Sequence, residues 1–70
     1  MSPIQIDPDI LGGKPCFAGT RVPVATLFEL LERGRSIDYF LDGFPSVTRE
    51  QIVAVLDLAC ERVTAIQIPA

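Results

Sequence analysis

Few residues in this 70-residue sequence have the types and spacing that catalysis or ligand binding requires. The first candidate is the pair Gly13-Lys14. A Gly-Lys pair ends the phosphate-binding P-loop, whose backbone N–H groups and lysine hold phosphate oxygens. A P-loop also needs a glycine five residues before the pair and a serine or threonine after it, but Pro8 and Pro15 occupy these positions. Because proline has no N–H to donate, and no G-x-G-x-x-G run is present, we reject both a P-loop and a dinucleotide site.

The two cysteines, Cys16 and Cys60, are the second candidates for chemistry. A catalytic cysteine usually needs a histidine base, and a zinc site needs four ligands that are mostly histidine and cysteine. The chain has no histidine and no third cysteine. We therefore predict that the protein is not an enzyme and holds no metal or cofactor. Both cysteines are expected to be small apolar core residues in a reducing cytoplasm.

Arg21 is the third candidate, because it lies between a turn and a helical segment among apolar neighbours. Asp7, Asp9 and Asp42 could each accept its guanidinium in a bidentate ion pair. Arginine suits half-buried ion pairs, so we predict that Arg21 pins the turn to the helices. The other interpretation is that Arg21 is presented to a partner or to phosphate.

Residues 12–24, with three glycines and two prolines, must position these groups. Glycine adopts positive φ without a Cβ clash, and proline fixes φ at about −65°. Two turns, one at each glycine cluster, are expected to flank a short extended segment over residues 16–18. The last proline suits the first turn of a helix, and the threonine before it could cap that helix. The residues of this predicted structural motif are Gly13, Pro15, Gly19, Thr20, Arg21 and Pro23.

The chain is expected to form a single domain over residues 1–70, with a β element and double turn in residues 1–22. Residues 4–6 alternate apolar and polar and predict a short strand that pairs with the extended segment. Residues 23–63 are expected to hold three helices. The apolar tail, residues 64–70, repeats an Ile-Gln-Ile triplet, so we predict that it adds a strand to the ribbon or to a partner sheet.

The first two helices are predicted over residues 23–33 and residues 37–42. Val24, Leu27, Phe28 and Leu31 recur with the spacing of one helical face. A glycine follows the first helix where a left-handed residue is favoured, and a serine precedes the second as its N-cap.

The third helix is predicted over residues 49–63, because Thr48 and Gln51 form a Ser/Thr-x-x-Glu/Gln capping box. Its apolar stripe is Ile52, Val55, Leu56, Ala59 and Val63, flanked by Val53, Leu58 and Cys60. A helix that is apolar over much of its circumference is normally buried somewhere. Burial on two sides within the domain and a second face for a partner are both open interpretations.

Composition favours a protein that associates with another polypeptide. The chain is 49% hydrophobic, and a domain of this size buries only about 60% of its unfolded surface, so we predict a homodimer or higher oligomer. The formal charge of −3 argues against strong non-specific binding to nucleic acid. We expect neither a membrane span nor a signal peptide, because no apolar run is long enough and no basic segment opens the chain.

The sequence from residue 6 to residue 63 resembles the bacterial "domain of unknown function 433" family. The residues that carry the resemblance are 12–24, 27–28, 34, 36–37, 40–41 and 44–51, with Gly19-Thr20-Arg21-Val22-Pro23-Val24 as their most specific run. The resemblance implies a mainly α fold, a three-helix, helix-turn-helix-like (homeodomain-like) bundle with a short N-terminal β element. It also implies an antitoxin of the VapB kind, since members of the family often sit beside a PIN-like toxin nuclease.

Two functions follow as hypotheses. The first is an interaction protein that neutralises a PIN-like nuclease by covering its acidic, metal-using site with apolar surface and an arginine. The alternative is a DNA-binding transcriptional regulator, although its third helix is electrostatically neutral in an acidic domain. For the DNA contacts, the opposing interpretation of the charged residues is ordinary solvated charge. The candidate contacts with a partner or DNA are Phe44, Arg49, Gln51, Arg62, Arg33 and Arg35.

Overall fold

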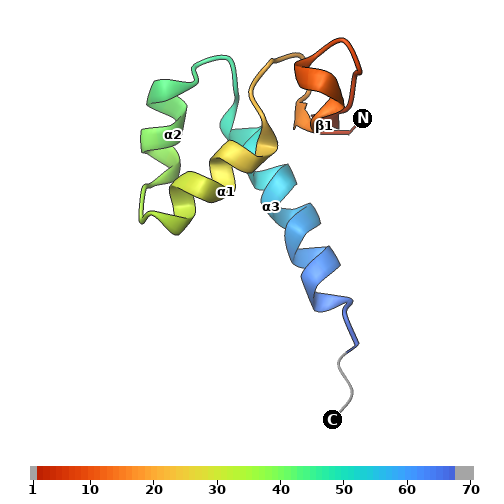
Figure 1. The fold of residues 1–70 in the computed structure, drawn as a ribbon. Helices are drawn as coiled ribbons and strands as arrows, with labels where there is room; N and C mark the ends of the chain where they lie inside the picture. Colours follow the sequence, from red (N-terminus) through yellow and green to blue (C-terminus); the bar gives the residue numbers. More distant parts are fainter. Residues whose placement is uncertain (1, 68–70) are drawn as a thin grey trace.

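The structure of the protein is a computed structural model, in which residues 2–67 are described. Its elements are β1 (Ile4–Gln5), the 3₁₀ helix η1 (Leu11–Gly13), β2 (Cys16–Phe17), α1 (Val24–Glu32), α2 (Ile37–Gly43) and α3 (Arg49–Thr64). Figure 1 shows a small ribbon at one end of three helices. The predicted fold class is therefore confirmed, and each predicted helix differs from the observed one by one or two residues at its ends.

The β element is a two-stranded antiparallel ribbon, in which Ile4 pairs with Phe17 and Gln5 pairs with Cys16. The Gln5 side chain also holds the turn after β2. Its amide nitrogen donates to the Thr20 carbonyl at 3.1 Å, and its oxygen accepts from the Gly19 N–H at 3.0 Å. One polar side chain therefore fixes both the ribbon and the following turn.

Left-handed residues make both turns. Leu11, Gly12 and Gly13 have φ values of 51°, 66° and 86°, and Gly19 has φ 77°. Gly12 and Gly19 meet the expectation that glycine is needed there, whereas Leu11 is a non-glycine residue in a conformation that glycine adopts at lower cost.

Thr20 does not cap α1, so this prediction was wrong. The Thr20 hydroxyl donates to the Phe17 carbonyl at 2.9 Å and accepts from the Val22 N–H at 3.1 Å. These bonds satisfy the turn itself. The N-cap of α1 is Pro23, with no side-chain hydrogen bond, so that Pro23 lies just before the helix.

The predictions for the end of α1 and the starts of α2 and α3 are confirmed. At the end of α1 the Gly34 N–H donates to the Leu31 carbonyl and the Arg35 N–H to the Leu30 carbonyl, which is the Schellman pattern. The Ser36 hydroxyl accepts from the backbone of α2, and the Thr48 capping box is complete at the start of α3. These caps define where α1 ends and where α2 and α3 begin. They therefore fix the lengths of the α1–α2 and α2–α3 connections.

The core lies where the ribbon meets the three helices. Its largest fully buried side chains are Phe17, Phe40, Leu27, Ile52 and Cys16. They come from β2 and from each of the three helices, whereas the 3₁₀ helix η1 contributes no buried residue.

The two cysteines have different environments. Cys16 is fully buried and its thiol donates to the Lys14 carbonyl, as expected for a core residue. Cys60 is exposed on α3, so its predicted burial was wrong.

We predict that Cys60 alone reacts with an aromatic disulfide reagent in the native protein, because only its sulfur is accessible. Absorbance should report one thiol per chain before denaturation and two thiols afterwards. A Cys60→Ser variant should show no native reaction. Equal rates for the two thiols in the native protein would contradict the burial of Cys16.

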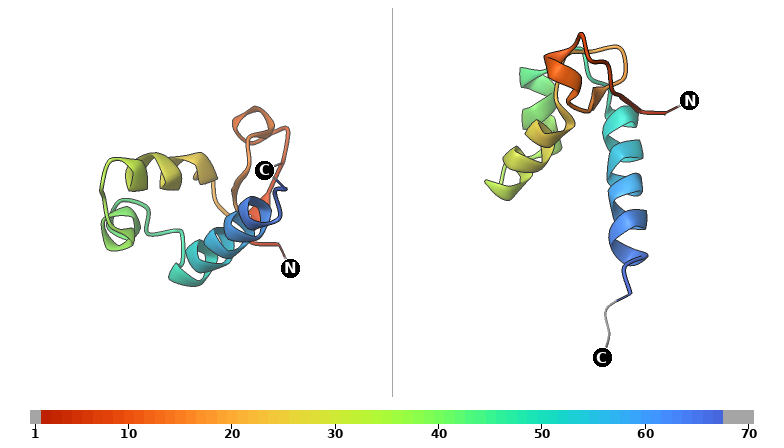
Figure 2. Two further views of the ribbon diagram at one scale, coloured as in Figure 1. Left: turned by 90° about the horizontal axis from the view of Figure 1, so that it is seen from below. Right: turned by 45° about the vertical axis from the view of Figure 1, so that its right-hand side comes forward.

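The second half of α3 projects beyond α1 and α2, as Figure 1 and the right-hand view of Figure 2 show. Of its predicted stripe, Ile52 and Val55 are buried but Val63 is 66% exposed. The stripe therefore continues past the end of the core that covers its beginning.

The predicted strand in the tail is not present in residues 65–67, and residues 68–70 lie outside the described residues. No helix within residues 2–67 combines the length and apolar character that a membrane crossing needs.

Candidate interaction surfaces

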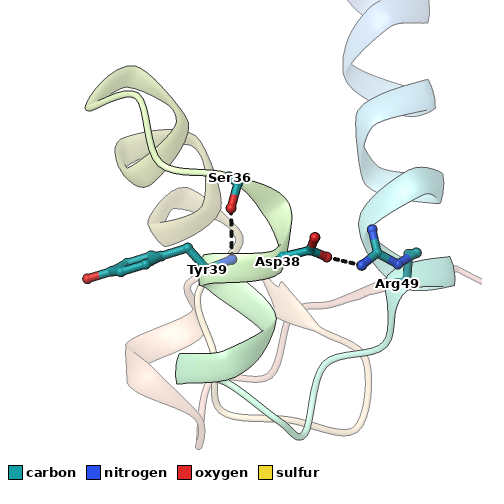
Figure 3. Close-up of polar contacts among 4 residues, drawn as sticks. All are labelled: Ser36, Asp38, Tyr39 and Arg49. Carbon is teal, nitrogen blue, oxygen red and sulfur yellow. Dashed lines mark hydrogen bonds and ion pairs between the residues drawn. The ribbon is translucent and has the colours of Figure 1, made fainter.

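The charged residues are arranged differently from the prediction. Within residues 2–67 the single ion pair joins the Arg49 guanidinium to the Asp38 carboxylate, which connects α3 with α2 (Figure 3). Arg21 is exposed and forms none of its three predicted ion pairs. The predicted pinning role of Arg21 was therefore wrong, and the Gln5 contacts hold the turn instead.

The Gln51 amide is fully engaged within the chain. Its oxygen accepts from the Thr48 N–H at 3.0 Å, and its nitrogen donates to the Ala18 carbonyl at 2.9 Å. The second bond joins α3 to the turn after β2. A side chain with both polar ends occupied has little freedom to contact a base edge or a partner.

An open cleft of about 570 Å³ lies between α1 and α2. We call it the α1–α2 cleft, and it is lined by Thr26, Leu30, Tyr39, Asp42, Gly43 and Phe44. Phe44 is half-buried, since its ring packs in a tilted arrangement against the core residue Phe40 with the centroids 4.8 Å apart. Its remaining surface faces the cleft, which combines apolar walls with one carboxylate.

A cation–π pair lies beside the α1–α2 cleft. The Arg35 guanidinium carbon is 4.9 Å from the centroid of the Tyr39 ring. Tyr39 is 51% exposed, and in Figure 3 its ring points away from Arg49 while the Asp38 side chain points toward it. Together with Arg33, which is exposed at the end of α1, this pair places two cations and an aromatic ring at the turn between α1 and α2.

A second hollow of about 250 Å³ runs between α3 and the N-terminal half of the chain. We call it the α1–α3 groove, and its lining residues are Ile4, Val24, Phe28, Val55, Leu58, Ala59 and Arg62. Its walls are almost entirely apolar, and Arg62 supplies the one charge. The structure thus separates the six predicted contact residues into three places, with Arg62 here, Arg49 and Gln51 at the start of α3, and the other three near the α1–α2 cleft.

Sequence reasoning missed Tyr39, although a signal for it was present. Ser36 predicts the start of α2, and Arg35 and Tyr39 stand four residues apart across that start. Arg35 precedes the N-cap and lies outside α2, but at this spacing its side chain is beside the first turn of the helix and reaches the Tyr39 ring. No group of three or more histidine, cysteine or acidic side chains within residues 2–67 could hold a metal ion.

These features define a small, mainly helical domain in which a two-stranded ribbon closes one end of three helices. The chain belongs to the family described as "Protein of unknown function (DUF433)", which matches residues 4–59. It is 44% identical over 49 residues to the uncharacterized protein y4eO of Sinorhizobium fredii. That match covers 70% of this chain but only 22% of the relative, so the chain spans about a fifth of the relative's length. No solved structure matches the chain.

Proposed function

We propose that this chain is a protein-interaction domain of the antitoxin kind, which binds a PIN-like nuclease through the turn between α1 and α2. The observation that carries the proposal is the exposed Arg35–Tyr39 pair at the edge of an open apolar cleft. The choice of nuclease as partner comes from the family resemblance, in which such genes are often neighbours.

The chemistry of the two surfaces is complementary. Arginine and tyrosine are the residues that most often anchor protein interfaces. A guanidinium makes bidentate hydrogen bonds with carboxylates, and the metal-using site of a PIN-like nuclease is acidic. Arg35 and the adjacent Arg33 could therefore occupy that site while the α1–α2 cleft receives an apolar side chain of the nuclease. The overall charge of −3 makes this a local match of charges rather than a general attraction.

DNA binding has less support. Of the side chains expected to reach base edges, Arg49 is paired with Asp38 and Gln51 is bonded to the backbone. A recognition helix needs such side chains free to enter the major groove.

The test is co-expression of the tagged chain with the product of the adjacent gene, followed by titration of the purified partners. We expect Arg35→Ala to weaken binding about tenfold or more, because an arginine at the centre of an interface commonly contributes at least 1.4 kcal/mol. Arg21→Ala is the matched control, since it removes an exposed arginine on another part of the surface.

The wild-type chain should inhibit the nuclease, and Arg35→Ala should lose this inhibition to the same extent that it loses binding. If the two proteins never co-purify, the proposed function is wrong. If Arg21→Ala and Arg35→Ala weaken binding equally, the turn between α1 and α2 is not the contact surface.

A further inference from the structure

The apolar stripe of α3 is covered at its beginning and uncovered at its end. Ile52 and Val55 are 0% and 2% exposed, whereas Val63 and Ile66 are 66% and 61% exposed. The spacing of three or four residues from Ile52 through Val55 and Ala59 to Val63 places all of them on one side of α3, and Ile66 follows two residues after the end of the helix. Val63 is therefore exposed because the core ends before it, and not because it faces away from the core.

The α1–α3 groove lies directly beside this uncovered stripe. Leu58 and Ala59 of α3 form one wall of the groove, and Ile4 and Phe28 contribute to the other. Leu58 is itself 37% exposed. A hollow and a protruding apolar ridge therefore stand next to each other on the same face of the molecule.

We propose that this face is the interface of a homodimer, in which the end of α3 from each copy packs into the α1–α3 groove of the other. In this arrangement a two-fold axis passes near Ala59, and the two α3 helices run antiparallel. Each copy then contributes both the end of its α3 and its α1–α3 groove to the contact. Such an isologous interface requires one patch to be complementary to itself, and a ridge beside a groove meets that requirement.

The exposed area of the chain fits this occupant. The chain exposes 5205 Å², whereas a compact monomer of 7.6 kDa is expected to expose about 4300 Å². The excess of about 900 Å² is close to the roughly 800 Å² that each partner buries in a standard interface.

The charge distribution on α3 also permits two acidic chains to meet on this face. Glu50, Asp57 and Glu61 recur at intervals of seven and four residues, so they form a separate face of the helix. With 100° per residue, that acidic face lies opposite the stripe that ends in Val63. The only charge lining the groove is Arg62. The acidic side chains of α3 are therefore kept away from the contact.

The dimer uses a different face from the one proposed to bind the nuclease, so each proposal can fail without the other. Sedimentation equilibrium of the purified chain from about 1 to 100 μM reaches the weakest affinities typical of interfaces of this size, and a tighter dimer would be fully formed over the whole range. We expect wild type to approach twice the mass of 7.6 kDa. The double variant Val63→Asp/Ile66→Asp should weaken dimerisation roughly 700-fold, because the two copies together lose four buried apolar side chains at about 1 kcal/mol each. Both positions are largely exposed within the chain, so circular dichroism should show that the fold is kept.

Val53→Asp is the matched control, because Val53 is a 49% exposed valine on the same helix but away from the stripe. It should dimerise like wild type. A wild-type chain that is monomeric over the whole range would overturn the proposal, and so would a double variant that still dimerises with wild-type affinity. Loss of the dimer in Val53→Asp as well would assign the contact to another face of α3.

Discussion

Replacing Phe40 with alanine is expected to remove about 3–5 kcal/mol of the free energy of unfolding, which is the usual cost of deleting a buried phenylalanine. Phe40 is 1% exposed, and its ring lies 5.8 Å from that of Phe17 and 4.8 Å from that of Phe44. At the usual 0.05–0.15 kcal/mol per residue, a 70-residue domain has roughly 4–10 kcal/mol in total. The variant should therefore lose between about a third and all of the free energy of unfolding at 25 °C. Urea denaturation followed by far-ultraviolet circular dichroism measures the loss.

Tyr39→Ala is the control for this prediction. Tyr39 neighbours Phe40 on the same helix and is also aromatic, but it is 51% exposed. Its replacement should cost less than about 1 kcal/mol, because exposed side chains contribute little to folding. Similar losses in the two variants would mean that Phe40 does not join α2 to the ribbon through the core.

Local signals in the sequence were enough to predict the helices. Ser36 and Thr48 begin helices because their hydroxyls reach backbone N–H groups three residues on, and Gly34 ends one because it adopts φ 79°. Each of these interactions joins residues within one turn of helix. Whether these capping interactions form therefore depends little on the rest of the chain.

Interactions between distant residues were not predictable in the same way. The Gln51 bond to the Ala18 carbonyl spans 33 residues, and nothing in either segment indicates it. The Arg21 side chain was expected to find a carboxylate, but its place on the surface is fixed by how the ribbon packs. The exposure of Cys60 likewise depends on where the core ends along α3. Helical periodicity predicts which side of a helix is apolar but not how far a neighbouring element covers it.

The candidate site was predictable in part. Arg33, Arg35 and Phe44 were named from the sequence, and the structure places them near the α1–α2 cleft. The cleft itself depends on the angle between the two helices, which the caps and the core set together. Sequence patterns contain the caps but not the angle.

Replacing Gln51 with alanine is expected to cost about 2–4 kcal/mol, which is large for a side chain outside the apolar core. The change removes the acceptor for the Thr48 N–H, worth about 1 kcal/mol as half of a capping box. It also leaves the half-buried Ala18 carbonyl without its donor, which adds about 1–3 kcal/mol. Thr48→Ala is the matched control, because it breaks the same capping box and leaves the bond to Ala18 intact. Urea denaturation of both variants should show the larger loss for Gln51→Ala.

Gln51→Glu separates the cap from the bond between α3 and the turn. A carboxylate still accepts from the Thr48 N–H and is favourable in the first turn of a helix, but it has no hydrogen to donate to the Ala18 carbonyl. At neutral pH this variant should therefore keep the cap and lose the connection, with a stability between those of wild type and Gln51→Ala. Near pH 4, where a glutamic acid side chain begins to protonate, the protonated oxygen can donate again. The stability difference from wild type should then shrink as the pH falls. A difference that stays constant from pH 7 to pH 4 would mean that the bond to Ala18 contributes nothing to the fold.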